Sequence, residues 1–272
     1  TRAWLVGEEG RGVPTIIEMG TWTRLDCVLG TAGLMRGAVS QALHHARHRQ
    51  VFGKPLAQQP LMQNVLADLA LETEAAQPLG LRLAGAFDRR AEEQEALLMR
   101  LLTPAAKYWV CKRGPALAAE AMEVLGGNGY VEEGLAARIY RQMPLNSIWE
   151  GSGNVMCLDV LRALSKHGEA VDALAAELAP AYGRHAAFDR HADWLKDQLY
   201  RPDGIEALGR PLTQGIALAV QGAQLLRHAP DYVASAFCDS RFGQGLAQAG
   251  GAFGNLPAGS DFTRIIERAW PD

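Results

Sequence analysis

A short segment in the middle of the chain places a carboxylate beside residues that favour a turn. Glu150 is followed by Gly151 and Ser152. A glutamate in a dry pocket is one of the side chains that can act as a general base. The same residue also suits the N-terminus of a following helix, because the free N–H groups and the helix dipole attract negative charge. The residues alone leave both interpretations open.

Two other clusters contain residue types that bind ligands. Gly126 and Gly127 begin a Gly-Gly-Asn-Gly segment, which follows a predicted helix and lacks the GxGxxG spacing of a βαβ nucleotide site. Its glycines either let a ligand approach the backbone closely or simply end the helix. His44, His45 and His48 include a pair four residues apart. No third ligand of a suitable type is near them in the sequence, so we predict no metal site.

Helices must position these residues, because apolar side chains recur at helical spacing along most of the chain. The pattern predicts a helix over 24–49, a second from Pro60 that bends at Pro78 and ends near Asp88, and a third over 104–125. Further helices are expected over 135–142, 154–165, 170–178, 188–200 and 205–227. The predicted fold is therefore mainly all-α.

The character of the sequence changes near each end. Residues 3–6 are typical of a β-strand that runs into a glycine-rich turn, and a strand without a neighbour implies partner strands upstream. After Lys166 the sequence becomes rich in alanine and is interrupted by prolines. We therefore expect the end of a β-domain over 1–20, a helical bundle over 21–165 and an additional helical domain over 166–272.

Composition excludes several classes of function. The chain is 48% hydrophobic and 21% charged, as expected of a globular protein, and its net charge of −3 provides no basic field for nucleic acid. No apolar run approaches the roughly 20 residues that cross a bilayer, and the first residues do not resemble a signal peptide. The cysteines match no zinc pattern and are expected to be buried and reduced: Cys27, Cys111, Cys157 and Cys238. The predicted location is the cytoplasm.

Three segments, in this order and at these separations, resemble the C-terminal half of the acyl-CoA dehydrogenase family. They are Arg-Gln-Val-Phe-Gly-Lys-Pro-Leu at 49–56, Glu-Val-Leu-Gly-Gly-Asn-Gly-Tyr at 123–130 and Ile-Trp-Glu-Gly-Ser at 148–152. The resemblance implies a helical bundle next to a middle β-domain, in a homotetramer that binds acyl-CoA and holds FAD between domains and across a subunit interface. The flavin-binding loops of the middle domain are not in this sequence, so we expect the chain alone to be catalytically incompetent.

The resemblance also implies roles for individual residues. Glu150 aligns with the base that removes the α-proton of an acyl thioester while the β-hydride passes to FAD. Thr23 stands where one branch of the family has its base, and threonine cannot serve there. Arg24 and Asp26 lie near the acyl pocket, unless they form a surface ion pair. Arg49 contacts the FAD pyrophosphate, unless it is solvated at a helix end. The implied FAD contacts are Arg49, Phe52, Gly126, Gly127, Ile148, Trp149, Gly151, Ser152 and Asn154.

One branch of this family carries an additional helical domain and belongs to the bacterial response to DNA alkylation. Residues 122–129 and 141–161 resemble that branch, so the predicted function is FAD-dependent α,β-dehydrogenation of an acyl thioester within such a response. The alternative is a DNA-associated protective or structural protein on a non-catalytic dehydrogenase scaffold. Residues 166–272 contain ten basic and thirteen acidic side chains, a balance of −3. The basic cluster of this tail is interrupted by aspartates, which favours a solvated face of mixed charge: Arg184, His185, Arg190, His191, Lys196 and Arg201.

Overall fold

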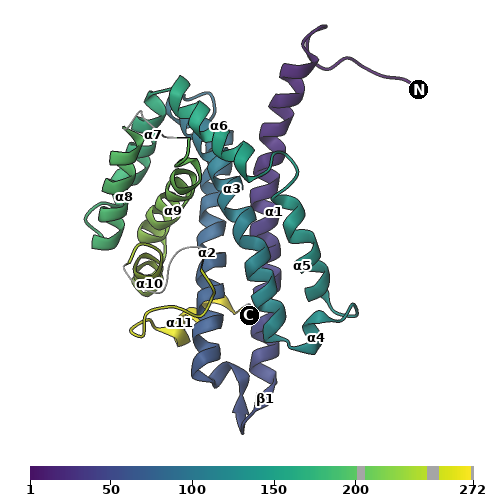
Figure 1. Cartoon of the computed structure of the whole chain (residues 1–272), viewed down its shortest axis with the longest axis vertical. Helices are drawn as coiled ribbons and strands as arrows, with labels where there is room; N and C mark the ends of the chain where they lie inside the picture. Colours follow the sequence, from purple (N-terminus) through teal and green to yellow (C-terminus); the bar gives the residue numbers. More distant parts are fainter. Residues whose placement is uncertain (201–205, 244–250, 271–272) are drawn as a thin grey trace.

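The protein is a bundle of long helices with a second group of shorter helices packed along one side (Figure 1). The computed structural model describes residues 1–200, 206–243 and 251–270. The bundle consists of α1 (Gly12–His48), α2 (Pro60–Asp88), α3 (Glu93–Val124), α4 (Gly127–Tyr130), α5 (Leu135–Asn146) and α6 (Gly153–Lys166). The tail consists of α7 (Glu169–Leu178), the 3-10 turn η2 (Ala179–Ala181), α8 (Ala186–Leu199), α9 (Gly209–His228), α10 (Asp231–Arg241) and α11 (Phe262–Ala269). The prediction of a mainly all-α fold is confirmed.

A small antiparallel hairpin joins α1 to α2. Its strands are β1 (Gln50–Val51) and β2 (Lys54–Pro55), and the 3-10 turn η1 (Leu56–Gln58) follows them. Phe52 and Gly53 form the turn of the hairpin, both with positive φ. The chain can therefore reverse direction within a few residues, which places the start of α2 beside the end of α1.

α3 lies at the centre of the bundle and packs against α1, α2, α5 and α6, as well as α7 and α9 of the tail. Along α1 the fully buried side chains Val28, Met35 and Val39 recur at helical spacing and face this core. α3 is buried on almost every side, so a charged residue within it must find a partner inside the protein. Lys107, near the middle of α3, is only 1% exposed.

The predicted N-terminal strand is wrong for the structure of this chain. Residues 3–6 form neither strand nor helix, and α1 begins at Gly12 rather than near Arg24. A strand is stable only when its N–H and C=O groups pair with a neighbour. The sole strands among the described residues are the two short ones beside α2. With no sheet next to it, the segment stays extended and exposed.

The third helix also begins earlier than predicted, at Glu93 rather than Pro104. A proline inside a helix costs about 3 kcal/mol because it lacks the N–H and crowds the preceding turn. The residues before Pro104 include Leu98, Leu101 and Leu102, which are almost fully buried. Each such side chain contributes about 1.5–3 kcal/mol through burial, so packing outweighs the proline. For the same reason α2 runs through Pro78 and ends at Asp88, where the predicted helix ends.

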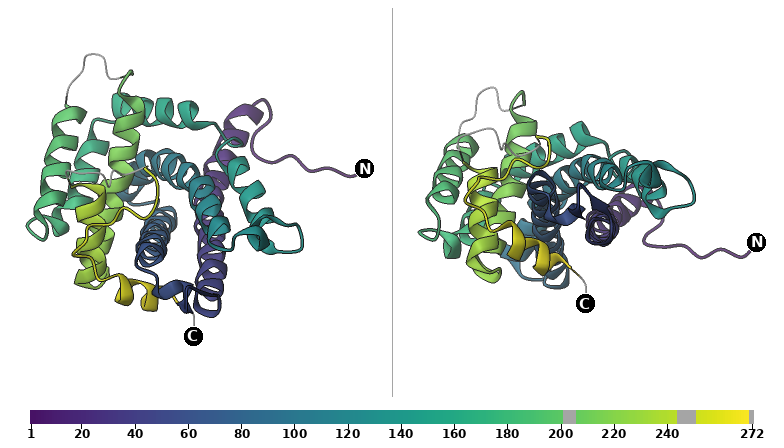
Figure 2. Two further views of the ribbon diagram at one scale, coloured as in Figure 1. Left: turned by 60° about the horizontal axis from the view of Figure 1, so that its bottom comes forward. Right: turned by 90° about the horizontal axis from the view of Figure 1, so that it is seen from below.

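The tail shares one hydrophobic core with the bundle. Figure 2 shows the tail helices beside α2 and α3, on the side away from α5, and α9 packs against α2, α3 and α6. The predicted helices over 170–178 and 188–200 are formed as α7 and α8, and α9 begins at Gly209. Ile205, the predicted start of that helix, lies outside the described residues. The domain boundary near residue 166 stays a prediction.

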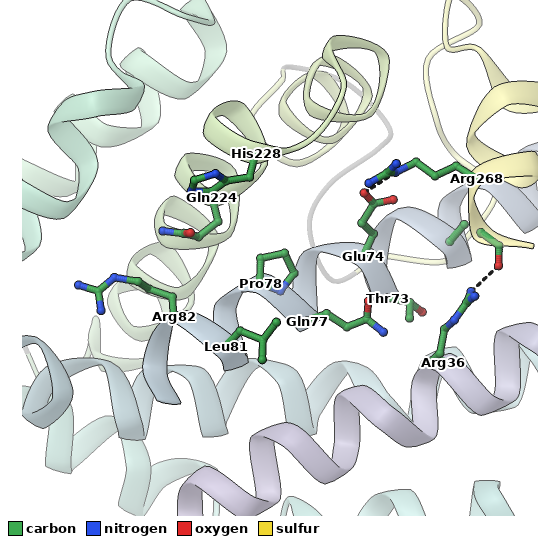
Figure 3. Close-up of a pocket in the computed structure, with 12 residues that line it drawn as sticks. Arg36, Thr73, Glu74, Gln77, Pro78, Leu81, Arg82, Gln224, His228 and Arg268 are labelled. Carbon is green, nitrogen blue, oxygen red and sulfur yellow. Dashed lines mark hydrogen bonds and ion pairs between the residues drawn. The ribbon is translucent and has the colours of Figure 1, made fainter. Parts of the chain in front are cut away.

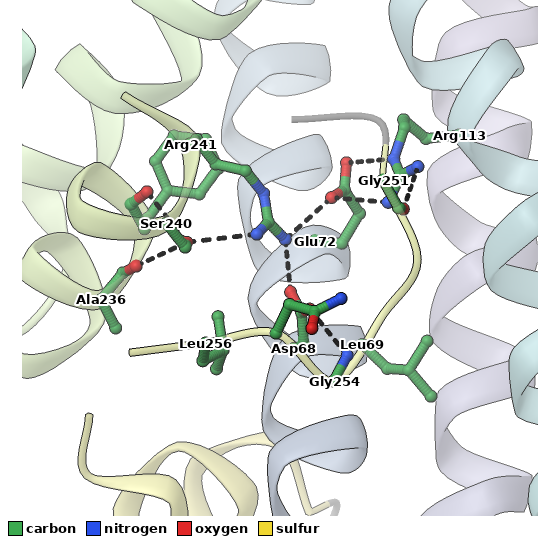
Figure 4. Close-up of polar contacts among 12 residues, drawn as sticks. Asp68, Leu69, Glu72, Arg113, Ala236, Ser240, Arg241, Gly251, Gly254 and Leu256 are labelled. Carbon is green, nitrogen blue, oxygen red and sulfur yellow. Dashed lines mark hydrogen bonds and ion pairs between the residues drawn. The ribbon is translucent and has the colours of Figure 1, made fainter. Parts of the chain in front are cut away.

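A buried ionic cluster also connects the tail to the bundle (Figure 4). Arg241 of α10 contacts Asp68 Oδ1 at 2.5 Å and Glu72 Oε2 at 3.0 Å, both on α2. Arg113 of α3 contacts the same Glu72 at 3.3 Å. Burial alone would raise the pKa of Glu72, but the charges and hydrogen bonds of Arg113 and Arg241 outweigh it and lower that pKa. The charges of two arginines and two carboxylates thus compensate one another inside the core.

In the part of the chain that the structure describes, no helix combines the length and the apolar character that a bilayer crossing requires.

Candidate functional site

The turn between α5 and α6 holds Glu150 in an unusual backbone conformation. Glu150 has φ of 58° and Gly151 has φ of 105°. Positive φ is ordinary for glycine but uncommon for a residue with a Cβ atom, and it costs of order 1 kcal/mol or more. A conformation of this kind persists only when its surroundings hold it in place.

Two cations from the bundle hold three consecutive carbonyl groups of this turn. Lys107 Nζ donates to Trp149 O at 2.7 Å and to Gly151 O at 2.5 Å, and Arg24 Nε donates to Glu150 O at 3.0 Å. Burial lowers the pKa of Lys107, although neighbouring groups partly oppose the effect. The hydrogen bonds satisfy backbone oxygens that would otherwise lose water without replacement. They account for the strained backbone of Glu150.

Arg24 is itself fixed by a carboxylate on α6. Its Nη1 lies 2.8 Å from Asp159 Oδ2, while Arg100 Nη2 lies 2.7 Å from Asp159 Oδ1. Burial alone would raise the pKa of Asp159, but the hydrogen bond from Arg100 and the charges of Arg100, Arg24 and Arg162 lower it. Arg24 therefore pairs with Asp159, and the alternative of an Arg24–Asp26 surface ion pair is not formed.

A pocket of about 670 Å³ opens between α1, α5 and this turn. Glu150 stands at its edge, and its Oε2 would lie 3.6 Å from a Cβ placed on Gly20 of α1. The pocket is lined by Thr23, Asp26, Cys27, Gly30, Gly33, Leu34, Gln142, Asn146, Trp149 and Glu150. The predicted pocket residue Asp26 is in its wall, whereas Arg24 supports the turn from behind. No side chain of the described residues caps α6, and Glu150 in particular forms no capping hydrogen bond there.

Several of the predicted flavin contacts surround the same turn. Ile148 and Trp149 are 63% and 47% exposed, although both are large and apolar. Ser152 is the N-cap residue that directly precedes α6. Asn154 Oδ1 accepts a hydrogen bond of 2.9 Å from Arg210 Nε of α9, so the tail contacts the site directly. The turn therefore presents an apolar surface and a helix N-terminus next to the pocket.

The other predicted flavin contacts lie at the opposite end of the bundle (Figure 1). Arg49 and Phe52 follow the end of α1, and Phe52 is 98% exposed. Arg24 and Arg49 are separated by 25 residues, which corresponds to roughly 37 Å of helix. Gly126, with φ of 62°, and Gly127 follow α3 at that same end. A single chain does not bring these residues to the Glu150 pocket.

A second cavity of about 680 Å³ lies where the tail meets α1 and α2 (Figure 3). Its wall contains three arginines, and each has a partner within the chain. Arg268 is 2.8 Å from Glu74, Arg82 contacts Glu95 and Glu177, and Arg36 donates to the carbonyl of Ala269. The arginines of this cavity therefore connect the tail to the bundle.

The basic cluster predicted in the tail does not form one surface. His191 is largely buried, its Nε2 lies 3.0 Å from Gly215 O, and burial lowers its pKa. His185 caps α8 through Nδ1, and Arg184 donates to Leu226 O. Arg201 lies outside the described residues. Within those residues, no group of three His, Cys, Asp or Glu side chains could hold a metal ion.

Lys107 and Asp159 are essential to this geometry, yet the motifs did not identify them. Each is a charged residue inside an apolar helical run: Lys107 is flanked by Ala106 and Tyr108, and Asp159 by Leu158 and Val160. A lone charge at such a position is rarely buried unless it is paired. That signal could have identified both residues, although it would not have revealed which carbonyls Lys107 holds.

Comparison with known proteins shows what this arrangement is similar to. Residues 10–165 match the family model described as acyl-CoA dehydrogenase, C-terminal domain. The chain is 50% identical over 249 residues to the putative acyl-CoA dehydrogenase AidB of Escherichia coli, covering 90% of this chain and 46% of AidB. It is 35% identical over 168 residues to acyl-CoA dehydrogenase family member 11 of Caenorhabditis elegans, covering 59% of this chain and 27% of that protein.

Solved structures agree with this similarity. The structure of Caenorhabditis elegans ACDH-11 in complex with C11-CoA superposes with a TM-score of 0.81 at 27% identity, covering 87% of this chain and 45% of that one. An acyl-CoA dehydrogenase from Bacillus anthracis complexed with FAD has a TM-score of 0.67 at 21% identity, covering 86% and 48%, and shows the fold alone. The chain thus spans less than half the length of these relatives.

Proposed function

The chain belongs to the acyl-CoA dehydrogenase family, and from that premise we propose that it supplies the substrate-facing helices of an FAD-dependent acyl-CoA dehydrogenase. Glu150 is the base of the proposed reaction. The observation that carries this proposal is the Glu150 turn, whose three carbonyls are held by Lys107 and Arg24 at the edge of a pocket. A turn fixed in this way keeps a carboxylate oriented toward a bound substrate.

The residues present suit a bound flavin. Ile148 and Trp149 expose apolar surface beside the pocket, which fits contact with a planar ring. The guanidinium of Arg49 has no side-chain partner among the described residues, and its fork of donors suits phosphate oxygens. Because Arg49 and Glu150 lie at opposite ends of the bundle, two subunits would contribute to one site. When bound, FAD accepts the hydride that leaves the β-carbon.

In the proposed reaction, Glu150 removes a proton from the carbon next to the thioester carbonyl. Its carboxylate must be ionised and aimed at that carbon, and the strained backbone supplies the aim. Lys107 and Arg24 bind only backbone oxygens of the turn and leave the Glu150 carboxylate free to accept the proton. The proton then remains on Glu150 until the product departs.

The visible spectrum of the FAD-loaded complete protein tests the proposal. Addition of an acyl-CoA should bleach the flavin band, because hydride transfer reduces FAD. Glu150→Gln should retain the flavin and slow bleaching by at least about 100-fold, the usual contribution of a general base. Glu133→Gln, an exposed glutamate outside the pocket, is the matched control and should behave like the unchanged protein. Equal bleaching by the Glu150 variant would contradict the proposed base.

We also propose a homotetramer, as the family resemblance implies. Large apolar side chains that are exposed in the single chain support an interface on α4 and α5: Tyr130, Val131, Leu135, Tyr140 and Leu145. Light scattering on the purified protein tests the assembly. A cytoplasmic role in the response to DNA alkylation, implied by resemblance, is proposed together with it. Retention on duplex DNA at low salt that is lost in Arg184→Ala/Arg190→Ala would favour the alternative, a DNA-associated protein.

A further inference from the structure

The wall of the Glu150 pocket is mostly apolar but contains acidic and amide side chains along the path that an acyl chain would follow. Its residues on α1 extend from Thr23 to Leu34, about 16 Å of helix. Beyond Thr23 the wall contains Asp26, and Gln142 and Asn146 face it from α5. At Gly30 and Gly33 an added Cβ would meet no atom of the described residues within 4 Å, so the space beside them is open in that part of the chain.

Among the residues that the structure describes, no cation forms an ion pair with the acidic groups of this pocket. No lysine or arginine lines it, and neither Asp26 nor Glu150 forms a side-chain ion pair with any described residue. The two cations that hold the Glu150 turn are engaged with other groups: Lys107 with carbonyl oxygens and Arg24 with Asp159. The pocket therefore has two negative charges facing space that a ligand can fill.

A hydrogen-bond chain adds a third acceptor at the same place. Cys27 O can only accept, so Cys111 Sγ donates to it across 3.6 Å. Thr31 Oγ1 then donates to Cys111 Sγ at 3.4 Å, and Asn146 Nδ2 donates to Thr31 Oγ1 at 2.9 Å. Burial raises the pKa of the Cys111 thiol to about 11, so its donor proton is retained.

With these donors, each of the three hydrogen bonds uses one proton. The amide nitrogen of Asn146 must therefore face Thr31, which fixes the orientation of the amide. Asn146 is 95% buried, as only 5% of it is exposed, and its Oδ1 has no partner among the described residues. The pocket thus combines two carboxylates with an unpaired amide oxygen. Such a set of acceptors suits a ligand that brings both positive charge and N–H donors.

We propose that this pocket selects acyl thioesters whose chain ends in a protonated amine, with Asp26 and Asn146 binding the ammonium group. The inference rests on the proposed function, because it assigns Glu150 to the α-carbon and the deeper acceptors to the chain end. An ammonium group fits better than a metal ion, since no group of three ligating side chains occurs among the described residues. Gly20, beside which Glu150 Oε2 lies, is six residues before Asp26, roughly 9 Å along α1. A six-carbon acyl chain spans that distance together with the polar contacts at its two ends.

The test compares two thioesters of equal length on the FAD-loaded complete protein: 6-aminohexanoyl-CoA and heptanoyl-CoA. Calorimetry should give a dissociation constant at least about tenfold lower for the amino compound, the usual effect of one charged hydrogen bond. Asp26→Asn should reduce that preference by about tenfold. Asp26 is exposed in the chain, so the variant should fold normally, which its thermal midpoint verifies. Glu18→Gln, on α1 but outside the pocket, should keep the full preference.

Flavin bleaching on the same samples separates the two proposals. If the amino compound binds more tightly and neither thioester bleaches the flavin, the selection stands and the dehydrogenase function fails. If both bleach it and heptanoyl-CoA binds equally or more tightly, the function stands and the selection is overturned. Absence of binding by both thioesters, or an unchanged preference in Asp26→Asn, also overturns the selection.

Discussion

Lys107 reaches from the middle of α3 to two carbonyl oxygens of the turn that carries Glu150. A buried ammonium is costly unless its N–H groups find acceptors, and here two of them donate to backbone oxygens of the turn. The positive φ of Glu150 adds strain that these contacts hold in place. At the scale of the residue, the position of the proposed base therefore depends on a lysine that lies on another helix and binds the backbone of the turn.

Replacing Lys107 with methionine should loosen this turn while preserving the bulk of the side chain. Two carbonyls lose their donor, so the free energy of unfolding should fall by about 1–3 kcal/mol. Flavin bleaching by acyl-CoA should also slow, and arginine at the same position should not restore it because its planar fork is larger and differently shaped. Denaturant titration and stopped-flow absorbance measure the two effects. Lys166→Met, on the exposed end of α6, should change neither.

At the scale of the element, periodicity predicted most helices and misplaced those whose ends depend on packing. The sequence pattern predicts that the third helix begins at Pro104. Burial of the preceding leucines instead extends α3 back to Glu93. The strand predicted over 3–6 does not form, because a local preference for extended backbone is not enough without a neighbouring strand. α10 and α11 were not predicted, because their apolar patterns are short.

Only part of the candidate site could be predicted from the sequence, because the rest depends on how the helices pack. A motif identifies residues that follow one another, such as Glu150 and Gly151, and the structure places this turn at a pocket. Asp159 is 135 positions from Arg24, so no local pattern joins them. The unpaired acceptor of Asn146 arises from contacts among α1, α3 and α5. Such contacts are decided by how the helices pack.

His191 makes the contact between α8 and α9 sensitive to pH. Burial lowers its pKa below the ordinary value of 6.5, so the folded protein favours the neutral ring. As pH falls, His191 binds a proton in the unfolded chain before it does so in the folded protein. The stability that the neutral ring contributes is therefore present above about pH 6.5 and is lost below it. The ring contacts Trp194, Phe242 and Gly215 O. These groups carry no charge that would stabilise the protonated ring.

The measurement is chemical denaturation of the unchanged protein and of His191→Gln between pH 7.5 and 5. As pH falls, the free energy of unfolding of the unchanged protein should decrease relative to that of His191→Gln, by at most about 1.4 kcal/mol per pH unit. Glutamine can still donate to Gly215 O but does not titrate in this range. His167→Gln, an exposed histidine after α6, serves as the control and should show no comparable change. A difference independent of pH would contradict the prediction.

At the scale of the whole molecule, the tail and the bundle are joined by apolar packing and by charge. α9 lies against α2 and α3, and its buried side chains belong to the same core as theirs. Arg241, Asp68, Glu72 and Arg113 add a buried ionic cluster across that contact. Asn154 and Arg210 extend the connection to the beginning of α6, next to the Glu150 turn. A change at the tail contact should therefore reach the site.

Arg241→Met provides the sharpest test of this coupling. It leaves Asp68 and Glu72 buried with Arg113 as their remaining cation, and breaking a buried ion pair from one side costs about 3–5 kcal/mol. The pKa of Glu72 should rise, because Arg241 is one of the two groups that lower it. Arg141→Met removes an ion pair with Glu132 in which both side chains are exposed, and it should cost less than about 1 kcal/mol.

Both variants should be followed by denaturant unfolding with two probes, tryptophan fluorescence for tertiary packing and circular dichroism for helix content. If tail and bundle form one cooperative unit, the two probes should give the same midpoint in each protein, and Arg241→Met should lower that midpoint as a whole. Separate transitions in the unchanged protein would instead mean that the tail unfolds alone. In that case the buried cluster would connect two independent units, and the Glu150 turn would be protected from changes at Arg241.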